Sequence, residues 1–198
     1  LRITSERQRS AMSLRMVPIR QSFQKMARLV RDLGKKTNKD IELVLSGEET
    51  ELDRKLVEDI QDPLMHMVRN SVDHGIESAE QRARSGKPAR GRLALSACHQ
   101  SGQIVIAISD DGAGLDEERI LAKAVAQGIV PPGETLSKSE IHQLVFRPGF
   151  STAKEITEIS GRGVGMDVVR RNIDALRGRI EIQSTPGQGT TFLIKLPL

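Results

Sequence analysis

A glycine-rich stretch near the end of the chain contains the residue types that bind phosphate. Residues 151–166 read STAKEITEISGRGVGM, so Gly161, Gly163 and Gly165 come just before an apolar helical pattern. The first amides of a helix have no intrahelical partner, and residues without a Cβ let phosphate oxygens approach them closely. The spacing differs from a Walker A loop and from the dinucleotide G-x-G-x-x-G. Phosphate binding and a plain loop with a helix cap fit this stretch equally well.

A second group of polar side chains lies on one face of an expected helix. His66, Asn70, Asp73 and His74 share that face, while the opposite stripe is apolar. Asn70 offers a neutral oxygen of the kind that Mg²⁺ accepts together with phosphate oxygens. His66, one turn earlier, could complete the ion's shell or contact a phosphate. Each residue alone is more often an ordinary surface group, but the cluster favours a site.

A carboxylate follows the most apolar run of the chain. Residues 103–109 contain IVIAIS, which is apolar on both faces and predicts a central strand. Asp110 comes next, followed by Asp111-Gly112-Ala113-Gly114, a turn that glycine makes easily. One interpretation is an Asp-Gly turn. The other is nucleobase recognition, because a buried carboxylate accepts a hydrogen bond from the adenine amino group and repels the oxygen that guanine carries there.

The first part of the chain predicts two helices and a strand. Met12, Met16 and later apolar residues up to Leu33 repeat at spacings of four and three. Pro18 interrupts this seam, so one helix should end by residue 16 and another should span residues 18–34, with Gly34 as its C-cap. The break is either a signalling hinge at residues 17–18 or a junction between two packed helices. A strand is expected over residues 41–45 and a short strand and loop over 51–53.

The remaining elements position the three candidate sites. In the helix that carries His66, Ile60, Leu64, Val68 and Val72 form the apolar stripe, and Pro63 should kink or divide it near Asp62. We expect a short helix over residues 78–85, strands over 92–99 and 103–109, and a helix over 117–127 capped by Asp116. Residues 128–162 predict a lid or a disordered segment with one short helix near 139–146. A helix starting near residues 163–165 and a hairpin of 179–184 with 192–196 complete the chain.

Length and composition narrow the class of protein. The 198 residues suit one sizeable domain plus an appendage, and no run of eighteen apolar residues or signal-peptide pattern occurs, so we expect a cytoplasmic protein without membrane insertion. Cys98, the single cysteine, is expected to be a small residue on a sheet in a reducing compartment.

Residues 1–36 contain ten Lys or Arg against two acidic residues. Without Trp, Tyr or clustered Phe, this charge indicates a solvated helix face rather than nucleic-acid binding, which salt-dependent binding would test.

Taken together, the motifs resemble the GHKL ATP-binding fold, and specifically the catalytic domain of CheA-type chemotaxis histidine kinases. Residues 66–77 are similar to that family's N box, 110–114 to its first glycine box, 146–150 to its F box, 161–166 to its second glycine box and 187–190 to its third. The resemblance covers residues 16–198. It divides the chain into residues 1–16, the end of a dimerisation helix with a hinge, and residues 17–198, the ATP-binding domain.

The resemblance implies an α/β fold, a two-layer sandwich with a mixed sheet, helices on one face and a mobile ATP lid between Phe146 and Gly161. It also implies ATP and Mg²⁺ as ligands, with Asn70 binding the metal beside His66 and with Arg69 joining them in catalysis. Asp110 would read adenine. The other ATP contacts that it implies are Asp73, His74, Gly112, Gly114, Phe150, Ser151, Thr152, Lys154, Gly161, Arg162, Gly163, Val164, Gly165, Met166 and Thr190. Some family members carry a lysine directly after the Ser-Thr pair, whereas here Ala153 intervenes before Lys154.

The function implied is transfer of the ATP γ-phosphoryl group to a histidine in two-component chemotaxis signalling. No histidine precedes His66, so the acceptor must lie on a phosphotransfer domain of the same kinase or another chain. Further expected partners are a receptor and coupling-protein array and a response regulator, and the full-length protein would be a homodimer although this fragment would be monomeric. The alternative is a gyrase- or MutL-type ATPase, in which a glutamate four residues before the N-box asparagine activates water. That position is His66 here, which favours the kinase.

Overall fold

The computed structural model describes residues 15–150 and 165–198, which form a mixed five-stranded sheet covered by helices. The strand order is β2-β4-β5-β7-β6, with β2 (Ile41–Ser46) parallel to β4 (Gly91–Gln100) and the other neighbours antiparallel. β5 (Gln103–Asp110) is the central strand, as expected. β6 (Arg179–Thr185) and β7 (Gly189–Pro197) form the final hairpin. In this sheet Asp110 ends a strand that has neighbours on both sides.

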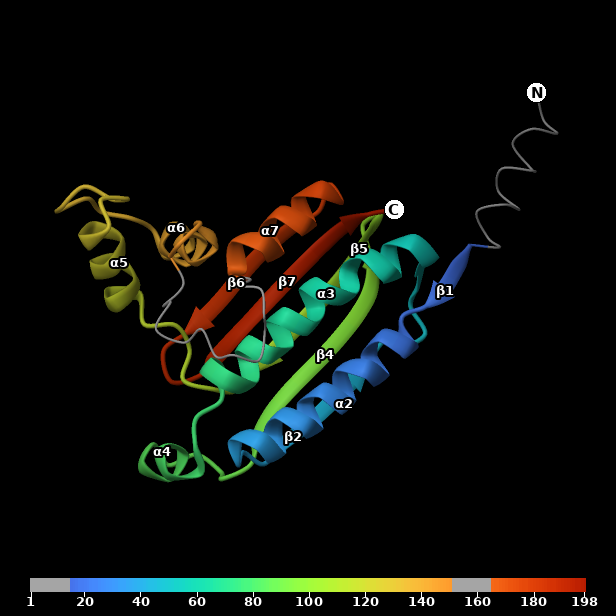
Figure 1. Ribbon diagram of the computed structural model, residues 1–198, viewed down its shortest axis with the longest axis horizontal. Coiled ribbons are helices and arrows are strands. Elements are labelled where there is room, and N and C mark those ends of the chain that lie inside the picture. The colour runs from blue at the N-terminus through green and yellow to red at the C-terminus, as the bar shows by residue number, and fades with distance from the viewer. Residues whose placement is uncertain (1–14, 151–164) are drawn as a thin grey trace.

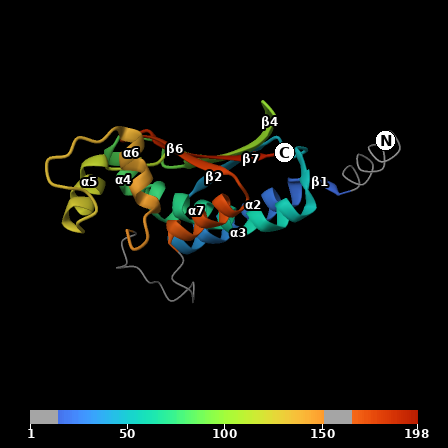
Figure 2. The same ribbon diagram turned by 90° about the horizontal axis from the view of Figure 1, so that it is seen from above.

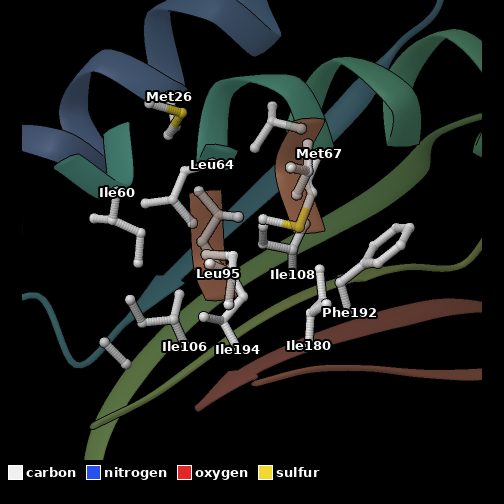
Figure 3. Packing of buried hydrophobic residues seen from close by; sticks show 14 of the residues in the cluster. Met26, Ile60, Leu64, Met67, Leu95, Ile106, Ile108, Ile180, Phe192 and Ile194 are labelled. Atoms are coloured by element: carbon white, nitrogen blue, oxygen red, sulfur yellow. The ribbon is translucent and has the colours of Figure 1, made fainter. Parts of the chain in front are cut away.

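Three helices cover one face of this sheet, so the predicted two-layer α/β fold is confirmed (Figures 1 and 2). They are α2 (Arg20–Thr37), α3 (Arg54–Asn70) and α7 (Met166–Ala175). Their apolar stripes meet the inner residues of the strands, and Figure 3 shows Met67 of α3 among side chains from the sheet. Ile60, Leu64, Val68 and Val72 are all buried, as their spacing predicts. The core therefore fixes the orientation of the α3 face that carries His66 and Asn70.

A smaller layer lies beside this core. α5 (Glu117–Ala126), α6 (Lys138–Gln143) and η2 (Leu144–Phe146) lie at the β6 side of the sheet in Figure 1. Asp116 caps α5 by accepting a hydrogen bond from the Arg119 amide at 3.1 Å. A second apolar cluster holds these helices together and includes Ala124, Val130, Leu144 and Phe150. The short α4 (Ala79–Arg84) starts with the capping box of Ser78 and Gln81.

The start of the described chain differs from the prediction of a helix ending by residue 16. Met16–Pro18 form a short strand, β1, which pairs antiparallel with β3 (Glu51–Asp53). Leu52 is fully buried at this pair, so a tertiary contact decides the local structure. The preceding helix itself falls on residues 1–14, outside the described residues. The proposed domain boundary after residue 16 stays a prediction.

The predicted C-cap of α2 is wrong, and so is one of the two alternatives at Pro63, the division of α3. Gly34 lies inside α2, and the C-cap is Asn38, which has a left-handed backbone with φ 54°. A Cβ on Gly34 would come within 2.9 Å of the Lys39 carbonyl oxygen, so glycine is needed there for the close return of the chain. Pro63 does not divide α3, which continues through it. Pro63 is buried in the helix layer, and tertiary packing outweighs the missing backbone donor.

Within the described residues, no helix is both long and apolar enough to span a membrane. Cys98 is exposed on β4 and is a free thiol. It therefore lies on a strand as predicted, but at the surface of the sheet.

Candidate active site

Asp110 is a buried carboxylate held by backbone amides from two distant segments. Its residue is 6% exposed, and Oδ1 accepts hydrogen bonds from the Gly112 amide at 2.9 Å and the Thr190 amide at 3.4 Å. Burial raises the pKa of Asp110 above its ordinary value of 3.8, while these amide hydrogen bonds act in the opposite direction. Within the described residues, Oδ2 has no hydrogen-bond donor, so one acceptor of this carboxylate is available for a ligand.

Two glycines let the backbone close around Asp110. A Cβ on Gly75 would lie 2.8 Å from Asp110 Oδ2, and a Cβ on Gly112 would lie 2.0 Å from the Gly75 carbonyl oxygen. The Ala113 amide donates to that same carbonyl at 3.0 Å. Any larger residue at either position would push the end of the N-box helix away from the carboxylate. Gly75 therefore belongs to the candidate site, although it was not among the predicted site residues.

Two hydroxyl groups add to the polar surface near this carboxylate. Ser71, the first residue of the π-helical turn η1 (Ser71–Gly75), is 2% exposed. Its Oγ lies near the Asp110 carboxylate, where it lowers that group's pKa as a hydrogen-bond donor, but no partner within the described residues meets it at normal hydrogen-bond geometry. Thr190 Oγ1 lies 3.0 Å from Ser184 Oγ. A buried hydroxyl without a partner is costly, and a bound nucleobase or an ordered water would satisfy it.

The other half of the candidate site lies between α3 and α7. Asn70 Nδ2 donates to Met166 Sδ at 2.7 Å, which joins the N box to the residue that begins α7. Burial and, secondarily, the charge of Arg69 lower the pKa of His66 below its ordinary value of 6.5, and Asp167 partly opposes them. His66 is therefore neutral at pH 7. The α3–α7 pairing thus brings the N box and the end of the second glycine box together.

The residues at this end fit a single Mg²⁺ ligand better than a complete metal cage. Nδ2 of Asn70 is directed at sulfur, and among the described residues its Oδ1 has no hydrogen-bond donor, so it can accept a cation; neutral amide oxygens suit Mg²⁺. A neutral His66 offers a nitrogen lone pair, which is a poorer match for this hard cation. Asn70 would hold the metal and His66 would lie beside it, while phosphate oxygens and water would supply the other ligands. When bound, Mg²⁺ would neutralise charge on the phosphates.

Some of the other predicted site residues lie away from both Asp110 and the α3–α7 end of the site. Asp73 and His74 are exposed on η1, and among the described interactions neither side chain bonds to His66 or Asn70. The buried Phe150 packs in the second apolar cluster, where Lys123 Nζ lies 5.0 Å from its ring centroid. Gly114 has φ 74° and closes against Thr185. The predicted contacts of Ser151, Thr152, Lys154, Gly161, Arg162, Gly163 and Val164, together with the part of the predicted lid that follows Phe150, lie outside the described residues.

Sequence reasoning missed a charged cluster behind the first glycine box. Arg82 of α4 is 1% exposed and forms ion pairs with Glu77 and Asp111, each at 3.0 Å. Lys87 pairs with Glu77 at 2.8 Å. In the sequence, Arg82 looks like a solvent-facing residue of a short polar helix, and no periodicity marks it as buried. The available signal was the mixture of opposite charges between the N box and the glycine box, where Glu77, Arg82 and Lys87 precede Asp111.

Comparison with known proteins identifies the family. Residues 59–198 match the model of the histidine kinase-, DNA gyrase B- and HSP90-like ATPases, and the chain belongs to this family. The matched residues include the N box, Asp110 and the final hairpin. The GHKL fold inferred from the motifs is therefore confirmed. The catalytic domain of the histidine kinase ThkA superposes with a TM-score of 0.58 at 15% identity, covering 92% of this chain and 93% of that one, which supports the fold.

The sequence relatives lie on the kinase side of this family. The chain is 56% identical over 191 residues to the chemotaxis protein CheA of Salmonella typhimurium and 52% identical over 197 residues to that of Treponema pallidum. The matches cover 96% and 100% of this chain but only 28% and 24% of those relatives. The chain thus spans about a quarter of the length of these relatives. The resemblance to the ATP-binding catalytic region of CheA-type kinases is confirmed, in preference to the gyrase or MutL type.

Proposed function

We propose that this chain binds ATP with Mg²⁺ and transfers the γ-phosphoryl group to a histidine on a separate phosphotransfer domain. The observation that carries the proposal is the geometry at Asp110. The buried carboxylate has both amide donors on Oδ1 and, within the described residues, an available Oδ2 beside Gly75 of the N-box turn, directly after the helix that holds His66 and Asn70. This arrangement matches the needs of a nucleotide that has a base with an amino group at one end and phosphates at the other.

In this proposal the base lies against Asp110. Oδ2 accepts the adenine amino hydrogen, and Gly112, Gly114 and Thr190 surround the base. The carbonyl oxygen that guanine carries at that position would meet a carboxylate held by amide donors on its other oxygen, so electrostatic repulsion favours adenine. The other proposed nucleotide contacts are Asp73, His74, Phe150, Ser151, Thr152, Lys154, Gly161, Arg162, Gly163, Val164, Gly165 and Met166.

In this proposal the phosphates lie toward α7. Catalysis of phosphoryl transfer depends mainly on positioning the reacting groups and neutralising the charge of the phosphates. Asn70 supplies the amide oxygen for Mg²⁺, and the neutral His66 and the cationic Arg69 lie on the same helix. The gyrase- and MutL-type position for a water-activating glutamate holds His66, whose lowered pKa keeps it neutral. The similarity to CheA proteins supports a histidine as acceptor. A receptor-coupled array upstream and a response regulator downstream are proposed partners on the same basis.

The test is a transfer assay with γ-labelled ATP, Mg²⁺ and a separate histidine phosphotransfer domain. Label should move to the acceptor histidine with the wild-type chain and should not move with Asn70→Ala, which removes the proposed metal ligand. Asp59→Asn, an exposed change on the same helix, is the control and should transfer normally. Release of free phosphate in steady turnover, with no label on the acceptor, would instead support the ATPase alternative.

A further inference from the structure

The charged cluster behind the first glycine box has a neutral total charge and is mostly enclosed. It contains Arg82, Lys87, Glu77 and Asp111, whose side chains are 1%, 17%, 10% and 42% exposed. Burial acts to raise the pKa of Glu77, but the hydrogen bond from Lys87 and the charges of Lys87 and Arg82 outweigh it and hold that pKa below its usual value. Glu77 is therefore held in its ionised form by the two cations.

Its cations bond to the backbone of the glycine box as well as to side chains. Lys87 Nζ donates to the carbonyl oxygens of Asp111 at 3.0 Å and Gly112 at 2.8 Å. Arg82 Nη1 reaches the Asp111 carbonyl at 3.3 Å, and its guanidinium also donates to both carboxylate oxygens of Asp111. Arg82 is itself fixed by the Pro88 carbonyl at 2.6 Å. Two carbonyls of the glycine box are thus held from outside by fixed cations.

The amides of the same two peptide units point toward the proposed adenine site. The peptide joining Asp111 to Gly112 gives its carbonyl to Lys87 and its N–H to Asp110 Oδ1. The next peptide gives its carbonyl to Lys87 and its N–H to the Gly75 carbonyl. A trans peptide is planar, with its N–H and C=O directed oppositely, so fixing one group fixes the other. A cation on the carbonyl also polarises the peptide and strengthens its N–H as a donor.

We propose that Lys87 and Arg82 are positioning residues for nucleotide binding, which hold these two peptide planes so that the Gly112 amide orients the Asp110 carboxylate. The inference rests on the proposed function, because it assigns its effect to adenine recognition. Lys87 and Arg82 act through the backbone and do not contact the nucleotide. Without Lys87, the two planes can rotate, and the free oxygen of Asp110 loses its fixed direction.

The test compares Lys87→Met with Lys87→Arg and with Lys195→Met in the full 198-residue chain. Lys195 also pairs with a glutamate, Glu181 at 3.2 Å, but in the β6–β7 hairpin, so its replacement is a matched control. ADP affinity by calorimetry should fall roughly tenfold in Lys87→Met, a loss comparable to one hydrogen bond, and should stay near wild type in Lys195→Met. Lys87→Arg keeps the charge and should recover most of the affinity.

Amide hydrogen exchange distinguishes a positioning role from a purely structural one, because loss of a positioning contact changes exchange only near the glycine box. Exchange at Gly112 and Ala113 should accelerate in unliganded Lys87→Met, while the core amides of β5 and α3 keep their protection. A variant that loses affinity only in proportion to a general loss of protection would overturn the inference. If Lys87→Met does not fold, Lys87→Gln takes its place. It removes the charge but keeps an N–H donor, so it should show a smaller acceleration at the same two amides.

The outcomes separate this inference from the proposed function. ADP binding by the wild-type chain together with equal affinity and equal Gly112 exchange in the Lys87 variants would overturn the positioning role alone. Failure of the wild-type chain to bind ADP would overturn the adenine site itself, and the positioning role with it.

Discussion

At the scale of single residues, the candidate site depends on one carboxylate oxygen of Asp110 that has no hydrogen-bond donor among the described residues. Asp110 Oδ1 is occupied by two amides, so the proposed contact to adenine falls on Oδ2. Asp110→Asn should keep the fold but weaken ATP binding by about 1–3 kcal/mol. The asparagine amide can turn its N–H toward the adenine amino group, so that two donors face each other and the hydrogen bond is lost. Calorimetry on the folded variant measures the change, with Asp59→Asn as the exposed control. Unchanged affinity would remove Asp110 from the adenine site.

His66 predicts a pH dependence of stability with a definite sign. Burial lowers its pKa in the folded state below 6.5, so the unfolded chain binds a proton more readily. Stability should therefore fall as the pH decreases through the unfolded value and should level off below the folded value. Urea unfolding of the wild type and His66→Gln at a series of pH values isolates this contribution. A stability difference between the two that did not vary from neutral to acidic pH would contradict the assignment.

At the scale of elements, the end of α2 shows how a backbone conformation selects a residue. Asn38 has φ 54° and ψ 43°, and its amide reaches the carbonyls of Gly34 and Lys35. Asn38→Gly should be at least as stable as wild type, whereas Asn38→Val should lose about 1–2 kcal/mol, because a β-branched residue is strained in this region.

The matched control for that prediction is the same change within a helix. Asn172 is exposed inside α7, where glycine adds backbone entropy to the unfolded state, so Asn172→Gly should reduce stability. Thermal or urea unfolding measures both variants. Equal loss of stability in Asn38→Gly and Asn172→Gly would show that the left-handed cap does not matter for α2.

At the scale of the whole molecule, the apolar seam near the start of the chain packs into the protein's own core. Phe23, Met26, Val30 and Leu33 of α2 are buried in the main core. The helix α2 itself lies over the sheet in Figures 1 and 2. They are therefore not available to a second chain. We predict a monomer in sedimentation at micromolar concentration. A tight dimer would require an interface formed by other residues, and truncation of residues 1–14 would test whether they supply it.

The sequence alone predicted the elements whose signals are local. The β4–β5 hairpin has a polar Ser101-Gly102 turn in which both residues adopt positive φ, and α5 starts at the Asp116 cap. The apolar stripe of α7 likewise packs as its spacing indicates. Asp110 could be selected because it follows a strand that is apolar on both faces. These features depend on neighbouring residues, so a linear pattern contains them.

Only the tertiary structure decided the features that depend on distant partners. Met16–Pro18 became a strand because β3 lies beside it, and Gly34 is required by the approach of Lys39 rather than by a helix end. The donors to Asp110 come from positions 112 and 190, which the sheet brings together. In the sequence Arg82 resembles a surface residue, but in the fold its side chain is enclosed and paired with Glu77 and Asp111. Long-range packing sets the environment of these groups, and burial decides whether a charge is a solvated surface group or part of a site.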